Sequence, residues 1–239
     1  MLRRAAPLAA LLILLGWPAA AQEFDVPEVD YPSLPGNASS AAGFVPEGWV
    51  PEKEIRGDLD MDGAEDLVLV LRDRNPANIL TPEWSEEERV DTNPRILATA
   101  LAAGEGYRLV LENHTLIPRV TSFAQSDPLS EAGGVAIDRG GLKVDLYYFS
   151  NAGGSDAGFC TYRFRYAGGR FGLIGYDRDN TNRMTGDTTV TSINFLTGKV
   201  VTTTGNIESD ETQTTTRRLP KRALRGIGEL GEGCVLDPE

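Results

Sequence analysis

Four aspartates with regular spacing are the residues of this sequence best suited to chemistry. Asp58, Asp60 and Asp62 alternate with other residues, Gly63 follows directly, and Asp66 comes three residues after the glycine. Carboxylates at alternate positions of a tight loop can converge on one point, and Ca²⁺ accepts roughly six to eight oxygen ligands. The glycine permits the sharp turn that such convergence needs. The spacing therefore predicts a metal-binding loop whose preferred ion is Ca²⁺.

Electrostatic repulsion is the main argument for a metal rather than a simple turn. Neighbouring carboxylates repel one another unless a cation lies between them. The alternative is an acidic Asx-type turn, in which side-chain oxygens accept nearby backbone N–H groups. A second acidic stretch, 177–182, lacks a glycine and follows a strand-like run, so we expect a hairpin turn there.

The pattern D-x-D-x-D-G-x-x-D, followed directly by an apolar run, resembles the calcium loop of FG-GAP and VCBS-type repeats, the kind found in integrin α-chain propellers. It differs from an EF-hand, because position 12 of the loop is Leu69 and a strand pattern follows. The resemblance implies that the loop joins two strands and binds one Ca²⁺ ion. The motif occurs once, and the whole chain is similar to exported bacterial proteins that combine one such loop with a hairpin like "SINFLTGK". The ligands implied by the resemblance are Asp58, Asp60, Asp62, the carbonyl oxygen of Ala64, and Asp66.

The elements around this loop have the periodicity of a mainly β protein with antiparallel sheets and hairpins. Apolar residues alternate with polar ones, and glycine turns separate the runs. Run 95–102 is ambiguous, since its alanines and leucines favour a helix whereas its length and neighbours favour a strand. A cap-like threonine followed by proline predicts one short helix at 82–90. The predicted strands are 66–71, 107–112, 142–149, 160–166, 171–176, 188–196 and 199–204.

Two stretches of the chain echo one another. "ATALAAGEGYRLVLEN" and "YRFRYAGGRFGLIGYD" both read as strand, glycine turn, aromatic residue and strand, and each follows an earlier apolar strand. Two duplicated three-stranded units would explain the echo, although any two hairpins share these features.

The N-terminus reads as an export signal. Residues 1–21 combine a basic start, an apolar run too short for an ordinary membrane span, and small residues before Gln22. Residues 22–50 are rich in proline, alanine and serine, which predicts a flexible leader. We expect residues 51–239 to form a single β-rich domain, located in the periplasm or secreted.

The net charge restricts the classes of binding partner, and the two cysteines indicate a disulfide. Loss of Arg3 and Arg4 with the signal would change the formal net charge from −12 to −14, which argues against nucleic acid and anionic membranes as partners. In an exported chain, Cys160 and Cys234 suggest a disulfide, with free thiols or a metal pair as alternatives. The one basic cluster, within 217–225, is expected to be a solvated segment or to dock an acidic partner.

No catalytic motif stands out. The sequence lacks a G-x-S-x-G elbow, a P-loop, a dinucleotide fingerprint and an H-E-x-x-H motif, and its only histidine, His114, follows a predicted strand. We therefore expect a calcium-stabilised β-rich binding module whose partner is an envelope protein or a polysaccharide. The alternatives are a hydrolase with a carboxylate-based site, which the many acidic residues allow, and an exported enzyme inhibitor. Sequence does not determine the oligomeric state.

Overall fold

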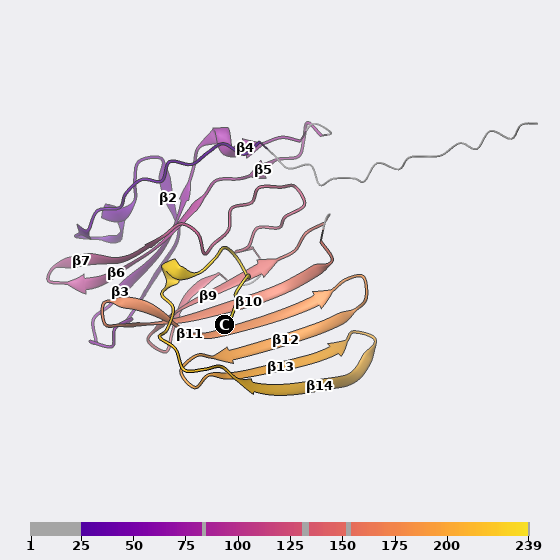
Figure 1. Ribbon diagram of the computed structural model, residues 1–239. Helices are drawn as coiled ribbons and strands as arrows, with labels where there is room; N and C mark the ends of the chain where they lie inside the picture. Colours follow the sequence, from indigo (N-terminus) through magenta and orange to yellow (C-terminus); the bar gives the residue numbers. More distant parts are fainter. Residues whose placement is uncertain (1–24, 83–84, 131–133, 152–153, 239) are drawn as a thin grey trace, which may run out of the picture.

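The computed structural model describes residues 25–82, 85–130, 134–151 and 154–238. Their regular structure consists of strands and short 3-10 turns, and every paired strand is antiparallel. The prediction of a mainly β fold is confirmed, and Figure 1 shows two large sheets lying against each other. The predicted signal peptide, residues 1–21, lies outside the described residues. Within the described part of the chain, no helix is long and apolar enough to cross a membrane.

The first sheet has five strands in the order β1-β7-β6-β3-β2. Its central strand β3 is apolar at consecutive positions because both of its faces are covered. Val68 and Val70 face the second sheet, whereas Leu67 and Leu69 face the opposite layer. The strands are β1 (Asn37–Ala38), β2 (Trp49–Gly57), β3 (Asp66–Asp73), β6 (Arg95–Ala103) and β7 (Gly106–Asn113).

The N-terminal segment supplies that opposite layer, so the domain begins earlier than the sequence predicted. Phe44 is fully buried and Leu34 nearly so, and both pack against Leu67 and Leu69. Strand β1 pairs with β7, and the 3-10 turn η1 (Ala41–Phe44) follows it. Of the leader predicted at 22–50, residues 31–50 therefore pack in the β-rich domain, because their few apolar residues cover an apolar sheet face.

The second sheet has seven strands in the order β14-β13-β12-β11-β10-β9-β8. Each strand pairs with its neighbour in the sequence, so the sheet is one continuous meander (Figure 1). The strands are β8 (Val135–Asp138), β9 (Gly141–Tyr148), β10 (Asp156–Ala167), β11 (Arg170–Asn182), β12 (Asp187–Asn194), β13 (Lys199–Asn206) and β14 (Ser209–Arg218).

The main core lies between the two sheets. Val68 and Val70 of β3 belong to the same buried cluster as Val144 of β9 and Tyr162 and Phe164 of β10. These residues occupy alternate positions of their strands, which is the pattern that predicted the strands. Two three-stranded meanders, β3-β6-β7 and β9-β10-β11, contribute to this core, one from each sheet. They match the two units proposed from the sequence, while their common origin stays a prediction.

Two local predictions differ from the structure. Residues 85–89 form no helix and Val90 begins strand β5 (Val90–Asp91), while residues 83 and 84 lie outside the described part. The glutamate-rich stretch lacks an apolar stripe, and the Ser85 hydroxyl instead accepts the Glu87 and Glu88 N–H groups. Residues 177–182 continue strand β11 rather than turning. Strand β5 pairs with β4 (Ile79–Leu80), which follows the 3-10 turn η2 (Pro76–Asn78).

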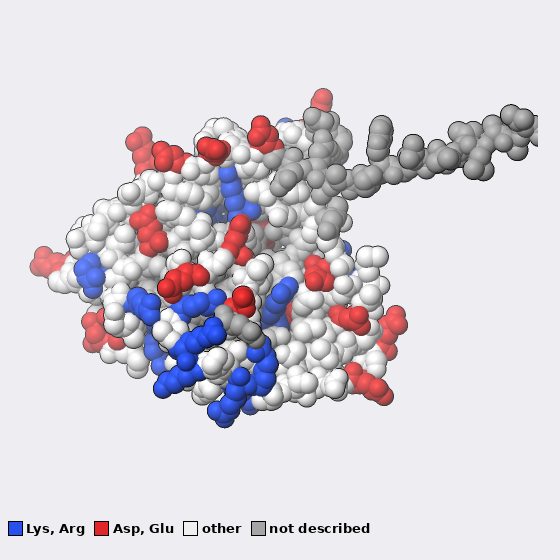
Figure 2. Space-filling model, viewed as in Figure 1, with Lys and Arg blue, Asp and Glu red and all other residues white. Residues whose placement is uncertain are grey.

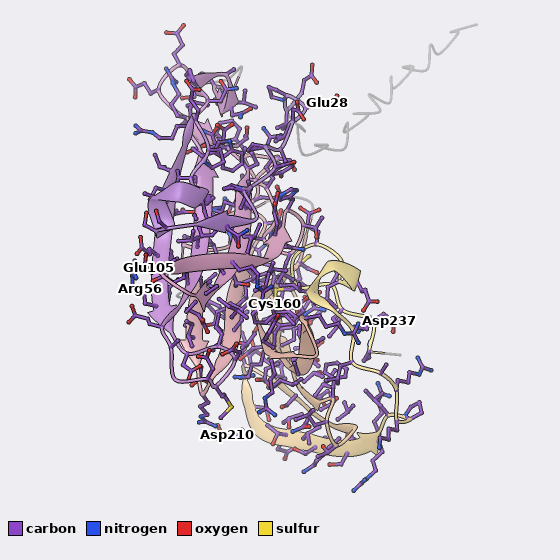
Figure 3. The ribbon with its side chains drawn as sticks, turned by 90° about the vertical axis from the view of Figure 1, so that its left-hand side faces the viewer. Glu28, Arg56, Glu105, Cys160, Asp210 and Asp237 are labelled. Carbon is purple, nitrogen blue, oxygen red and sulfur yellow. A yellow bond between two sulfur atoms is a disulfide. The ribbon has the colours of Figure 1, made fainter. Side chains whose placement is uncertain are left out.

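A disulfide joins the C-terminal segment to the second sheet, as the sequence predicted. Cys160 of β10 bonds to Cys234, beyond the 3-10 turn η3 (Ile227–Glu229). Two buried tyrosines add contacts on either side. The Tyr162 hydroxyl donates to the Gly233 carbonyl at 2.7 Å, and the Tyr176 hydroxyl donates to the Cys234 carbonyl at 2.8 Å. In Figure 3, Cys160 lies near the middle of the molecule, between the first sheet and the C-terminal segment.

Candidate metal centre and aromatic hollow

The aspartate loop joins β2 to β3, which are paired strands of the first sheet. The strands bring the two ends of the loop together, since Gly57 lies opposite Asp66 in the ladder. Met61 and Gly63 have positive φ angles of 66° and 86°. A left-handed residue other than glycine is uncommon, so the bend at Met61 must be stabilised by its surroundings.

Asp58 provides that stabilisation. Its Oδ1 accepts the Met61 N–H at 2.7 Å, and its Oδ2 accepts the Gly63 N–H at 3.0 Å. Asp62 accepts the Ala64 N–H at 2.7 Å, which is an Asx-type contact. The acidic-turn reading thus describes the backbone of this loop correctly, and it does not exclude a metal, because each carboxylate keeps unused lone pairs.

Asp66 connects the loop to the rest of the sheet. Its side chain is 1% exposed, its Oδ2 accepts the Leu59 N–H at 2.7 Å, and its Oδ1 accepts the Ala102 N–H at 2.9 Å. Since Ala102 belongs to β6, this carboxylate holds the loop against the neighbouring strand. Buried carboxylates are stable only when hydrogen-bonded in this way or bound to a cation.

Three of the predicted ligands converge. Asp58, Asp60 and Asp66 each offer one carboxylate oxygen, and these oxygens lie within 4.8 Å of one another. The cluster can hold a metal ion. Asp62 lies outside this group of three, and its role as a ligand, like that of the Ala64 carbonyl, stays a prediction.

Negative charge accumulates at Asp60. Desolvation raises the pKa of its carboxyl group, and the nearby charges of Asp62 and Asp66 raise it further. None of the ion pairs among the described residues involves a loop aspartate. An uncompensated group of carboxylates is the environment in which a divalent cation gains most.

The ligands available here are all hard oxygen atoms. Both cysteines are in the disulfide, and the only histidine, His114, lies directly after β7. Its ring stacks on Tyr31 at 4.2 Å between centroids, and its Nε2 lies 3.0 Å from Glu112 Oε1. His114 therefore helps to hold the N-terminal segment, as a strand-end histidine can. Oxygen-only sites favour Ca²⁺ or Mg²⁺ over transition metals.

An aromatic group on the second sheet was not predicted from the sequence. Tyr147 of β9 lies opposite Phe159 of β10, with ring centroids 5.0 Å apart, and stacks near Phe149 at 6.1 Å. Phe159 is 43% exposed, which is unusual for a phenylalanine. The Arg183 guanidinium lies 4.4 Å from the Phe149 ring centroid. Only the strand register brings these rings together, so the sequence pattern alone could not show them.

Beside this group is a hollow of about 220 Å³. Tyr147, Tyr148 and Phe149 form its aromatic wall. A few polar residues and three apolar ones complete the lining: Arg119, Gln125, Ser126, Ser150, Asp156, Pro118, Val120 and Pro128. An aromatic wall with a few polar groups is typical of small-molecule sites.

Comparisons with known proteins do not add a family. A scan against models of protein families, a search of curated proteins and a search of solved structures each returned no match to this chain. The similarity of the loop to FG-GAP and VCBS-type calcium loops therefore rests on the loop and the strand after it.

Proposed function

We propose that this protein is an exported, calcium-stabilised β-rich module that binds a polysaccharide. The observation that carries binding is the pair of rings formed by the partly buried Tyr147 and the exposed Phe159, beside a mainly apolar hollow that has a few polar residues in its lining. Exposed aromatic clusters mark interaction sites, because a soluble protein gains nothing from leaving them in water. The disulfide supports export, since such bonds persist in oxidising compartments such as the periplasm or the extracellular space.

A sugar ring fits the chemistry of this surface. One face of a pyranose ring is made of C–H groups and can stack on an aromatic ring, while its hydroxyl groups need hydrogen-bond partners. The wall of Tyr147, Tyr148 and Phe149 supplies the first, and Gln125 and Asp156 supply the second. An envelope protein is the other partner class, and the binding test distinguishes the two.

The binding test uses affinity electrophoresis through gels that contain soluble neutral polysaccharides. We expect wild-type protein to be retarded by at least one of them, and Phe159→Ala and Tyr147→Ala to be retarded several-fold less. Val190→Ala is the matched control, because Val190 is an equally exposed apolar residue of the same sheet (44% exposed). If the wild-type protein is not retarded, or if all the variants are retarded equally, the hypothesis of polysaccharide binding is wrong. An envelope protein then becomes the proposed partner.

We assign Ca²⁺ as the ion of the aspartate loop, with a structural role. It would neutralise Asp58, Asp60 and Asp66 and stabilise the turn between β2 and β3. An ion that binds only the folded state stabilises it by mass action, by about 2.7 kcal/mol when its concentration is about 100 times the dissociation constant.

The calcium test is a thermal melt of the disulfide-bonded mature chain in EDTA and in millimolar calcium. We expect calcium to raise the wild-type midpoint, and we expect Asp58→Ala and Asp62→Ala to lose that rise. Glu105→Gln is the matched control for loss of one exposed charge, since Glu105 lies in the β6–β7 turn at the edge of the molecule labelled in Figure 3. Identical wild-type midpoints in both solutions would exclude a calcium site at millimolar affinity.

The alternative of a carboxylate-based hydrolase would need a pair of acids such as Asp187 and Glu211, which line one surface hollow, but their surroundings give it little support. Asp187 and Glu211 share an open, threonine-lined surface at the far end of the second sheet. A carboxylate-pair hydrolase needs one acid of raised pKa to protonate the leaving group. Hydrogen bonds from Thr185 and Asn206 instead lower the pKa of Asp187.

A further inference from the structure

The free edge of the second sheet is a long strand with a polar sequence. Strand β14 (Ser209–Arg218) has ten residues, all exposed and none of them proline. In Figure 1 it forms the lower margin of the molecule, with no other element beyond it in that view. The opposite edge, β8, is only four residues long and lies against the first sheet, where Ile137 approaches Gly57. Long open edges invite another strand, and soluble proteins protect them or use them.

The backbone of β14 has hydrogen-bonding groups directed away from the sheet. The Leu219 N–H, directly after the strand, donates to the Gly198 carbonyl at 2.8 Å. Antiparallel ladders alternate residue by residue, so from Gln213 to Leu219, where the register with β13 is regular, odd-numbered residues bond to β13 and even-numbered residues point to the open edge. Thr214 and Thr216 therefore offer main-chain N–H and C=O groups to a further strand.

The charges on β14 are arranged in two halves of opposite sign. Asp210 and Glu211 lie near its start, and Arg217 and Arg218 lie at its end. Figure 3 shows Asp210 at the lower end of the molecule, opposite the end that carries Glu28, and Figure 2 shows basic side chains gathered on the lower part of one face. A strand that is acidic at one end and basic at the other is complementary to an antiparallel copy of itself.

Symmetry selects one register. A two-fold axis between antiparallel strands places one residue opposite its own copy. With Thr214 on the axis, counting along the two strands places Asp210 opposite Arg218 and Glu211 opposite Arg217, and each pair occurs twice. Since the β13–β14 register shifts at residues 210–212, the partner strand must follow that irregularity at each end. With Gln213 on the axis, the same two acids face threonines, and a parallel arrangement would place like charges side by side.

We propose that β14 is a homodimerisation strand, through which two copies of this chain pair antiparallel around Thr214 to form one continuous sheet. The partner that the edge fits best is thus a second copy of the chain. Main-chain hydrogen bonds would supply most of the attraction, and the charged ends would set direction and register.

Sedimentation equilibrium of the disulfide-bonded mature chain from 1 to 100 µM tests the proposal. We expect a dimer at the upper end. We expect Arg217→Glu with Arg218→Glu, whose strand is acidic throughout, to be monomeric, and Asp210→Arg with Glu211→Arg, whose strand is basic throughout, to be monomeric as well. An equimolar mixture of the two should form a heterodimer. Lys221→Glu with Arg222→Glu makes the same charge change outside the strand and should leave the dimer intact.

Amide hydrogen exchange of the wild type provides a test that needs no variant. The Thr214 and Thr216 amides should exchange at least tenfold more slowly at 100 µM than at 1 µM. A wild type that is monomeric at every concentration would overturn the proposal. So would a dimer whose β14 amides stay unprotected, or two charge variants that fail to combine although each keeps the wild-type circular dichroism spectrum.

Discussion

At the scale of single residues, the charge of Asp60 has opposite effects on the stability of the fold with and without a bound metal ion. Its carboxylate stands near those of Asp58 and Asp66, and its pKa is raised by desolvation and by these neighbours. Without a cation the Asp60 charge destabilises the folded loop, whereas with a cation the same charge binds the ion. One substitution should therefore have effects of opposite sign in the two conditions.

We predict that Asp60→Asn raises the stability of the metal-free protein by about 0.5 kcal/mol, because repulsion among exposed carboxylates is relieved. In millimolar calcium the same variant should be less stable than wild type, because a neutral amide is a weaker ligand than a carboxylate. Chemical denaturation in EDTA and in calcium measures both signs. A variant that is destabilised equally in the two solutions would show that Asp60 has only a structural role.

A second residue-scale feature is a buried cation held by two acids. The Arg95 side chain is 3% exposed, with Nε 2.6 Å from Glu52 Oε2 and Nη2 2.7 Å from Asp127 Oδ2. Desolvation, the largest single effect, would raise the pKa of Asp127, but the hydrogen bonds from Arg95 and the Leu129 N–H, together with the charges of Arg95 and Arg72, outweigh it and the pKa is lowered. A buried charge that loses a partner destabilises the fold, so this group should matter for stability.

We predict that Asp127→Asn costs about 2 kcal/mol of unfolding free energy at neutral pH, in line with loss of a charge-assisted hydrogen bond. Because folding lowers the pKa of Asp127, its ionised form stabilises the native state above the unfolded pKa of about 3.9. That contribution is lost as the pH falls below this value and through the folded pKa. The difference between wild type and variant in urea denaturation should thus shrink from pH 7 toward pH 3. A difference that does not change with pH would point to packing instead.

At the scale of elements, sequence patterns found the strands whose side chains alternate and missed those formed by pairing alone. Strand β3 is a continuous apolar run, strands β9 and β10 carry apolar residues at alternate positions, and all three were predicted. Strand β14 has no apolar residue, so no periodicity marks it, and it forms because β13 offers a partner edge. Helix-capping signals at 82–90 failed because no apolar stripe followed to bury a helix.

The contacts of the candidate site also fall into two groups: those that local spacing predicts and those that depend on pairing between distant strands. The spacing of the aspartates was enough to predict Asp58, Asp60 and Asp66 as neighbours, because a short loop between paired strands brings its own residues together. The contact from Asp66 to the Ala102 N–H crosses to β6, and the meeting of Tyr147 with Phe159 depends on register. Both are long-range pairings, which a local pattern does not contain.

The C-terminal segment is an element without regular strands, and its position depends on a few specific bonds. The disulfide closes a loop with a sequence separation of 74 residues, and the two tyrosine hydroxyls bind the carbonyls of Gly233 and Cys234. In the chain-entropy model, a cross-link over a loop of this length contributes about 4 kcal/mol by restricting the unfolded chain.

We predict that the double variant Cys160→Ser with Cys234→Ser unfolds at a free energy about 4 kcal/mol lower than wild type, and that reducing agent lowers wild type to the same value. Tyr176→Phe should cost about 1 kcal/mol, since it removes one hydrogen bond and leaves the cross-link in place. Urea denaturation with and without dithiothreitol measures both. If the reducing agent still lowers the unfolding free energy of the double variant, its effect does not come from loss of this disulfide.

At the scale of the whole molecule, the two sheets are covered unequally. The first sheet has the N-terminal segment on one face and the second sheet on the other, and β3 is buried over most of its length. In the second sheet, burial falls from β10 toward β14, whose ten residues are all exposed. Regions with few buried apolar contacts open more easily, so we expect β12 to β14 to be the least stable part of the monomer. Dimerisation through β14 would therefore stabilise strands β12 to β14.

We predict from this that the melting temperature of the protein depends on its concentration. If the native state is a dimer and unfolding separates the chains, a tenfold rise in concentration stabilises each chain by about 0.7 kcal/mol through mass action. For a chain of this size that corresponds to a rise of about 2 °C in the melting temperature. Thr214→Pro removes a main-chain donor from the open edge, and its melting temperature should stay constant from 1 to 100 µM. A wild-type melting temperature that is equally constant would mean that β14 remains a solvated edge, and that its opposed charges keep other strands away instead of recruiting one.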